Sequence, residues 1–432
     1  MQLEFPPIDN RIPKYRKNGI VNKLDAEDNR FHNCYRFVLS FPPHLVREYL
    51  SRFNLEVGDT ILDPFCGTGT TIIEAKLHGV SAIGIEANPV AHFATLVSVD
   101  WQVDPDELLE HASLIAKKAC EAISLANKTS LKTLPEEAFS LLLKDSISPL
   151  PLHKSLILLE QINMSVNGKF RQYELLALAK VLVFSISNLH FGPEVGVSRV
   201  KKEDALVVES WLDEMKSVVS DLRNTQNCDI PSTIFHADAR ELTHLIQPNS
   251  IDAVFTSPPY PNEKDYTRIT RLESVILGFM TTKAELRALK KGLLRSNTRN
   301  IYKGDNDDAW ITENSEIQAI SSAIENRRIA LGKTSGFEKL YGTVIKQYFG
   351  GMTRHLAELR TLLKPGAYLG YVVGDQASFF QIMIHTGELL AGIAQSLGYR
   401  VVSIDLFRTR LATATRQQLR EEVVVLQWLG QS

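Results

Sequence analysis

Short apolar runs that end in turn residues recur along this chain, separated by stretches with helical spacing. Runs at residues 61–62, 81–86 and 251–255 each lead into a polar or glycine-containing turn, as buried strands do. Residues 71–75 follow the first turn with helical spacing. Further strands are predicted near the end of the chain, at 367–374, 399–404 and 422–427. The pattern predicts an α/β fold with a mostly parallel sheet.

The middle of the chain has a different pattern. Between residues 101 and 227, apolar residues recur at helical spacing in three windows, 107–116, 175–186 and 205–222. We therefore predict a helical insertion between the second and third strands of the core. Residues 189–197 are predicted to form an exposed loop.

A glycine-containing loop joins the first predicted strand to its helix. Residues 62–71 read LDPFCGTGTT, and Gly67 and Gly69 let the backbone approach a ligand without an intervening Cβ. The free N–H groups of the helix that begins near Thr70 face the same ligand. The loop therefore predicts a ligand site.

The second predicted strand ends on an acid, Glu86, which follows Gly67 by 19 residues (86 − 67 = 19). At this spacing in α/β nucleotide sites, an acid accepts hydrogen bonds from ribose hydroxyls. The loop departs from the dinucleotide pattern, because Ile72 stands where the third glycine would, and Asp63 would repel a pyrophosphate. S-adenosylmethionine (SAM) fits better, since its carboxylate suits the helix N-terminus and its ammonium suits Asp63.

A rigid polar turn follows the strand at 251–255. Its residues are Ser257, Pro258, Pro259 and Tyr260. The two prolines fix φ and remove two backbone donors, so the turn presents mainly acceptors beside an aromatic ring. Such acceptors suit the exocyclic amino group of a flat heterocycle that stacks on Tyr260. A base within a duplex would have to be flipped out to reach this turn.

Together, these motifs resemble those of the amino-methylating DNA methyltransferases, which modify cytosine N4 or adenine N6. The family's cofactor loop, F-x-G-x-G, is matched by Phe65, Gly67 and Gly69, and its ribose acid by Glu86. Its catalytic tetrad, [S/N/D]-P-P-[Y/F/W], is matched by residues 257–260. The resemblance implies a Rossmann-like SAM-dependent methyltransferase core with one late antiparallel strand, and catalysis by Ser257, Pro258, Pro259 and Tyr260.

Two weaker elements extend the resemblance. Residues 37–46 resemble the family's element that holds the methionine end of SAM, and residues 236–242 resemble its acidic turn at the adenine. The resemblance then implies this set of cofactor-binding residues: Phe41, Asp63, Phe65, Gly67, Gly69, Thr70, Glu86 and Asp238.

A serine at the first tetrad position accompanies cytosine-N4 activity in this family, whereas Asp or Asn accompanies adenine-N6 activity. The resemblance thus favours cytosine N4 in double-stranded DNA, with adenine N6 as an alternative. A cysteine nucleophile in a Pro-Cys dipeptide, which C5-cytosine enzymes need, does not occur. RNA guanine-N2 methylation and non-catalytic DNA binding on the same scaffold also stay open. A cognate restriction endonuclease is the partner that the resemblance suggests.

Basic residues concentrate after the tetrad, although the formal net charge of the chain is −2. Residues 283–303 contain seven Lys or Arg and one acid, Glu285. We expect this segment to contact DNA phosphates, because the local field decides binding; a solvated helix face is the other interpretation. A basic, hydroxyl-rich loop is also predicted at 408–416. The predicted DNA-binding residues are Arg268, Arg271, Lys290, Lys291, Arg295 and Arg299.

The length of the chain indicates how many structural units it has, and its composition agrees with the predicted α/β fold. The 432 residues, 44% hydrophobic and 23% charged, suggest two or three structural units. We predict a cofactor-binding half at 1–100, an insertion at 101–229 that recognises DNA or caps the pocket, and a catalytic half at 230–432 whose DNA-contacting segment spans about 262–350. The four cysteines lack metal-like or disulfide-like spacing, and no apolar run could span a bilayer. The chain is expected to be cytoplasmic, with no metal and no membrane partner.

Overall fold

The computed structural model describes residues 31–35, 41–126, 130–165, 168–192, 194–225, 229–411 and 417–430. Residues 37–40 of the predicted methionine-end element, and residues 412–416 of the predicted basic loop, lie outside these ranges. No helix of the described ranges is long and apolar enough to cross a membrane.

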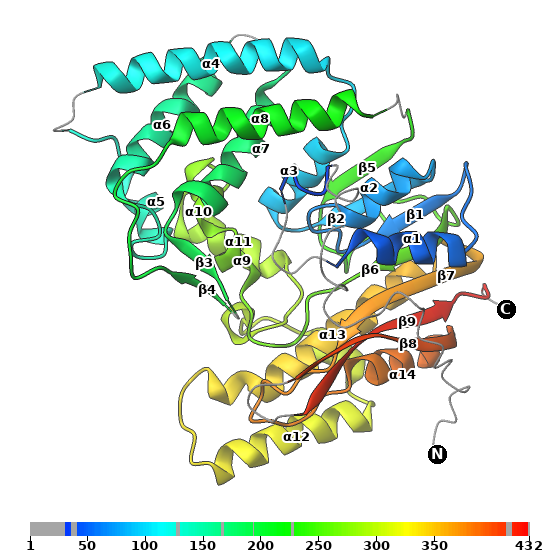
Figure 1. Cartoon of the computed structure of the whole chain (residues 1–432). Helices are drawn as coiled ribbons and strands as arrows, with labels where there is room; N and C mark the ends of the chain where they lie inside the picture. The colour runs from blue at the N-terminus through cyan, green and yellow to red at the C-terminus, as the bar shows by residue number, and fades with distance from the viewer. Residues whose placement is uncertain are drawn as a thin grey trace.

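A seven-stranded sheet forms the centre of the molecule (Figure 1). Its spatial order is β5-β2-β1-β6-β7-β9-β8, and β9 alone runs opposite to the other six strands. The prediction of a mostly parallel α/β sheet with one late antiparallel strand is thus confirmed. The strands are β1 (Thr60–Asp63), β2 (Ser81–Glu86), β5 (Ser232–His236), β6 (Ile251–Thr256), β7 (Leu363–Gly374), β8 (Arg400–Leu411) and β9 (Gln418–Gln427).

The direction of chain progress reverses between β1 and β6. From β1 the chain moves outward through β2 to β5, and from β6 it moves outward on the other side to β7. Ligands of open α/β sheets bind outside the carboxyl ends of the strands at such a reversal. The turns that follow β1 and β6 are the glycine loop and the Ser-Pro-Pro-Tyr turn, so the topology brings both predicted motifs to one edge.

Helices bury both faces of the sheet, because successive strand residues point to opposite sides. Ile61 and Phe255 pack in one hydrophobic cluster with α1 (Pro43–Arg52), α2 (Thr70–Leu77) and α3 (Pro89–Ser98). Leu62 and Val254 pack in the other with α13 (Tyr341–Leu359) and α14 (Thr386–Ser396).

The predicted helical insertion lies between β2 and β5, the second and third core strands, and is confirmed (Figure 1). Its buried residues, such as Leu108 and Trp211, belong to the same hydrophobic cluster as the α3 face of the sheet. One prediction here is wrong: residues 189–197 include an antiparallel hairpin rather than a plain loop. The insertion comprises α4 (Pro105–Leu125), α5 (Glu136–Leu141), α6 (Pro149–Met164), α7 (Arg171–Val181), a π-helix (Leu182–Ile186), β3 (Leu189–Phe191), β4 (Val195–Val197) and α8 (Val207–Arg223).

A second long connection joins β6 to β7 and contains the predicted DNA-contacting segment. Its basic helix α11 (Lys283–Gly292) buries none of its residues and begins with a capping box in which Thr282 and Glu285 exchange hydrogen bonds. Its other elements are α9 (Tyr266–Ile269), α10 (Arg271–Ile276), 3-10 turns at Thr298–Asn300, Asp307–Ile311 and Glu338–Leu340, and α12 (Ser315–Ala330).

Candidate active site

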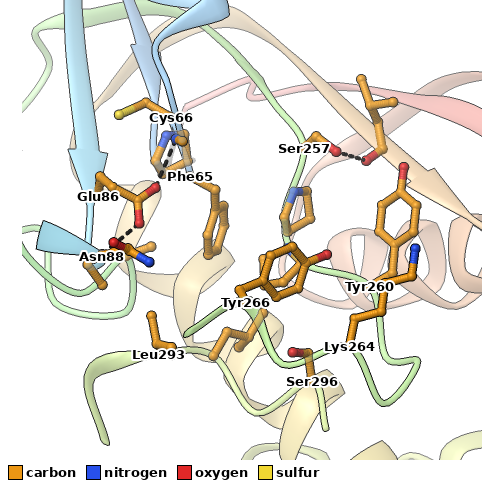
Figure 2. Close-up of a pocket in the computed structure, with 18 of the residues that line it drawn as sticks. Phe65, Cys66, Glu86, Asn88, Ser257, Tyr260, Lys264, Tyr266, Leu293 and Ser296 are labelled. Carbon is orange, nitrogen blue, oxygen red and sulfur yellow. Dashed lines mark hydrogen bonds between the residues drawn. The ribbon is translucent and has the colours of Figure 1, made fainter. Parts of the chain in front are cut away.

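The glycine loop and the Ser-Pro-Pro-Tyr turn open into one cavity of about 400 Å³. Two hydrogen bonds connect the segments behind it: Thr256 Oγ1 donates to Asp63 Oδ1 at 2.5 Å, and Thr71 Oγ1 donates to the Phe255 carbonyl at 3.2 Å. The volume is within the range of about 300–1,000 Å³ typical of small-molecule sites. The two motifs, predicted separately, therefore share one pocket (Figure 2).

The loop requires glycine for its backbone conformation. Gly67 has φ +55° and Gly69 has φ +86°, in the left-handed region that disfavours a side chain. A Cβ on Gly69 would also lie 2.8 Å from Thr95 Cγ2. Gly67 and Thr70 line the cavity, with Thr70 in the first turn of α2.

Glu86 is held for hydrogen bonding at the end of β2. Its Oε2 accepts the Gly67 N–H at 2.8 Å and its Oε1 accepts the Asn88 N–H at 2.7 Å (Figure 2). Each carboxylate oxygen keeps a second lone pair, and the group lines the cavity. Burial raises the pKa of Glu86 to about 7, against the lowering effect of these two backbone donors.

Asp238 lines the same half of the cavity and is fixed by a buried arginine. Arg240 Nε donates to Asp238 Oδ1 at 2.9 Å, its Nη2 donates to Oδ2 at 2.5 Å, and its Nη1 binds Asp307. The arginine thus holds the carboxylate in one orientation towards the cavity. Beside it, Phe65 packs edge-on against His355, with ring centroids 5.1 Å apart.

The prediction that Asp63 lines the mouth of the loop is wrong. The residue is fully buried and does not line the cavity. Its Oδ1 accepts hydrogen bonds from Thr256 and from the Phe65 N–H, and burial raises its pKa to about 6. Asp63 therefore joins the two loops from behind.

The Ser-Pro-Pro-Tyr turn presents an acceptor and an aromatic ring to the cavity. Ser257 Oγ donates to the Val372 carbonyl at 3.1 Å, which leaves its lone pairs to accept (Figure 2). Tyr260 lines the cavity beside it. Tyr266 lines it as well, between Phe65 and Tyr260 in the view of Figure 2, and burial raises its pKa to about 12.

Half of the predicted DNA-binding set is engaged inside the protein. Arg271 is buried and donates to backbone carbonyls of α5 and α9. Arg295, also buried, forms a bidentate pair with Asp305 at 2.9 and 2.8 Å. The Lys290 side chain is mostly buried in an ion pair with Asp265 at 2.8 Å. These three are removed from the prediction, which leaves Arg268, Lys291 and Arg299.

The sequence interpretation missed several residues of the cavity. Asn88 caps α3 through its side chain, a role that Asn followed by Pro just after a strand could have suggested. Tyr266 and Ser296 carried no comparable signal. The basic loop predicted at 408–416 also needs correction, because Arg408 and Arg410 lie within β8 and line the cavity.

The cavity suits SAM. Glu86 has acceptor positions for ribose hydroxyls, the start of α2 offers backbone N–H groups to a carboxylate, and Asp238 offers an acceptor to the adenine amino group. Phe41 also lines the cavity and packs edge-on against Phe255. Within the described ranges, no group of three or more His, Cys, Asp or Glu residues could hold a metal ion.

Comparisons with known proteins agree with this chemistry. Residues 12–95 match the family model of the N6/N4 DNA methylases. The chain is 27% identical to the Type II methyltransferase M.BsoBI of Geobacillus stearothermophilus over 435 residues, covering 92% of this chain and 84% of that protein. It is 22% identical to the Type II methyltransferase M.AvaI of Anabaena variabilis over 432 residues, covering 94% and 87%.

A third similarity is short. The chain is 35% identical to a tRNA (guanine(10)-N2)-dimethyltransferase of Methanothermobacter thermautotrophicus over 80 residues, which is 18% of this chain and 24% of that protein. The two DNA enzymes, by contrast, match along nearly the whole chain. The family model and the two long relatives therefore support an amino-methylating DNA methyltransferase, a class of enzyme that takes its methyl group from SAM.

Proposed function

We propose that this protein methylates the exocyclic N4 of cytosine in double-stranded DNA, at one short sequence, as the methylase of a restriction–modification pair. The observation that carries the proposal is the single cavity, which has Glu86 and Asp238 in one half and Ser257 and Tyr260 in the other. The serine that opens the tetrad favours cytosine over adenine.

The cofactor half of the cavity binds SAM and orients its methyl group. Glu86 accepts from the ribose and Asp238 from the adenine, while the first turn of α2 faces the carboxylate of the cofactor. Bound there, SAM supplies an electrophilic methyl group. The shape of the loop depends on Gly67 and Gly69, which admit the cofactor close to the backbone.

The catalytic half orients the amino group. Ser257 is held as an acceptor, because its own proton is directed to the Val372 carbonyl. It can accept a hydrogen bond from one amino N–H and keep the nitrogen lone pair directed at the methyl group, while Tyr260 stacks on the flipped ring. Transfer is then a direct displacement: the N–CH₃ bond forms as the S–CH₃ bond breaks, the demethylated cofactor leaves as a thioether, and the amino nitrogen releases one proton to solvent. Orientation and exclusion of water from the reacting atoms lower the barrier.

The proposed domain roles follow from the fold. The insertion and the β6–β7 connection would flank the DNA, with Arg268, Lys291 and Arg299 on phosphates. The three-unit division of the chain stays a prediction.

The test is transfer of a labelled methyl group from SAM to duplex DNA, followed by digestion to nucleosides and identification by mass spectrometry. The proposal predicts N4-methylcytosine within one sequence context. N6-methyladenine would instead support the adenine alternative. Methylation of transfer RNA in preference to duplex DNA would refute the DNA assignment, and an absence of transfer to any nucleic acid would refute the enzymatic one.

A further inference from the structure

The wall of the cavity beside Tyr260 is basic and comes from three separate segments. Lys264 follows the catalytic turn, Arg408 and Arg410 lie in β8, and Glu421 lies in β9; all four line the cavity. The wall is fixed close to the catalytic ring, because a Cβ placed on Gly374 would meet Glu421 Cγ at 3.1 Å and Tyr260 Cε2 at 3.2 Å.

The charges on this wall do not balance. Glu421 Oε2 pairs with Arg408 Nε, whereas Arg410 Nε is 3.9 Å from Glu421 Oε1. Within the described part of the chain, Lys264 Nζ has no hydrogen bond or ion pair. One carboxylate thus faces three cations, and the remaining acid within electrostatic reach of Lys264 is Glu194 of the β3–β4 hairpin.

The acids next to Lys264 in sequence have other partners. Glu263 accepts two hydrogen bonds from Thr298, at 3.0 and 2.8 Å, and Asp265 is paired with Lys290 at 2.8 Å. Lys264 is half-buried, and burial together with repulsion from Arg410 lowers its pKa. A bound anion would relieve this repulsion. Its attraction to the two cations would be only weakly screened, because the position is half-buried.

The carboxylate of the cofactor does not meet this need. It is assigned to the start of α2, in the half of the cavity that contains Glu86, whereas the basic wall adjoins Tyr260. A nucleotide that rotates out of a duplex brings the phosphates on either side of its sugar to the entrance of the base pocket.

We propose that Lys264 and Arg410 bind a phosphodiester of the DNA strand that carries the target base, next to Tyr260. The inference rests on the proposed function and adds to it the side of the pocket by which the substrate strand enters. Arg408, neutralised by Glu421, would support the wall rather than bind the phosphate.

The experiment measures the affinity of the full chain for duplex DNA at salt concentrations from about 50 to about 200 mM. The demethylated product of SAM is present throughout, so that the cofactor half is occupied and no methyl group is transferred. We expect Lys264→Gln and Arg410→Gln each to weaken binding and to reduce the slope of log K against log salt by about 0.9. The ratio of wild-type to variant DNA affinity should therefore decrease by roughly threefold as salt rises across this range.

A matched control removes a cation from the same strand away from the cavity. Arg400 is exposed at the beginning of β8 and hydrogen-bonds Gln427, so Arg400→Gln should leave the slope unchanged. Calorimetric titration of SAM and thermal unfolding, unchanged in both test variants, establish that the fold and the cofactor half are intact.

Replacing single phosphates of the target strand by neutral methylphosphonates locates the contact. At the contacted phosphate, Lys264→Gln should cause no additional loss of affinity. An unchanged salt slope in both variants would overturn the inference, as would weakened SAM binding or relaxed sequence preference in place of a slope change. If the wild-type protein bound no DNA at all, the proposed function itself would fail.

Discussion

The carboxylate of Glu86 offers the sharpest test of the cofactor site. Both of its oxygens already accept backbone N–H groups, from Gly67 at 2.8 Å and Asn88 at 2.7 Å. In Glu86→Gln, the amide NH₂ must face one of these donors, so one buried N–H loses its acceptor. The unpaired N–H costs about 1–3 kcal/mol of folding stability, whereas losing a charged acceptor for the ribose costs about 1.5–3 kcal/mol of binding free energy. SAM affinity should fall at least tenfold.

The same group predicts a pH dependence. Because the pKa of Glu86 in the free protein is about 7, the acceptor is lost as pH falls through that value, and SAM affinity should fall with it. Its effect on stability has the opposite sign. A carboxyl whose folded pKa lies above its unfolded value stabilises the native state at low pH, and this contribution is lost as pH rises through about 7.

Titration calorimetry between about pH 5.5 and 8.5 measures the effect, since this range spans the raised pKa. Wild-type affinity should rise with pH, whereas the affinity of Glu86→Gln should be low and nearly flat. Asp252→Asn is a matched control, because that carboxylate pairs with Lys364 at 2.7 Å at the opposite end of the sheet. Wild-type affinity in Glu86→Gln, or an undiminished pH dependence in it, would refute the assignment.

Three further substitutions test other parts of the site. Ser257→Ala should lower kcat for methylation by roughly 10²-fold with SAM binding unchanged, since it removes one oriented acceptor; an unaltered kcat in single-turnover assays would exclude that role. Gly69→Val should destabilise the protein by roughly 2–5 kcal/mol in urea unfolding and abolish SAM binding, because the new side chain meets Thr95 in a left-handed conformation; unchanged calorimetric affinity would contradict this. Arg240→Met should cost about 3–5 kcal/mol in the same unfolding assay and weaken SAM binding, because Asp238 loses its bidentate partner; wild-type stability would show that the pair contributes little.

The sequence predicted the parts of the site that are local in the chain. The glycine loop, Glu86 and the tetrad are each encoded within a few residues, by glycines at a turn, an acid at a strand end and a proline pair. The parallel sheet and the insertion could be predicted because apolar spacing is also a local property.

The errors share one physical origin, which is contacts between residues far apart in the chain. Asp63 was expected to face the ligand, because the glycine motif does not reveal that its partner is Thr256, 193 residues away. Arg271 was expected to contact DNA, because the local sequence does not reveal that its guanidinium donates to the Leu141 carbonyl, 130 residues away. Spacing within a motif carries no information on such partners, so Lys264 and Arg410 could not be placed in one wall either.

The pairing of β1 with β6 has a consequence for biosynthesis. Ile61 and Leu62 pair with Ala253 and Val254, so one edge of β1 has no native neighbour until the ribosome has made the whole insertion and the strand beyond it. Thr256 follows Asp63 by 193 residues, which at about 5–20 residues per second take roughly 10–40 s to synthesise. An apolar strand with an open edge can pair with other chains during that interval, so the yield of native protein should depend on translation speed and on chaperones that shield nascent chains.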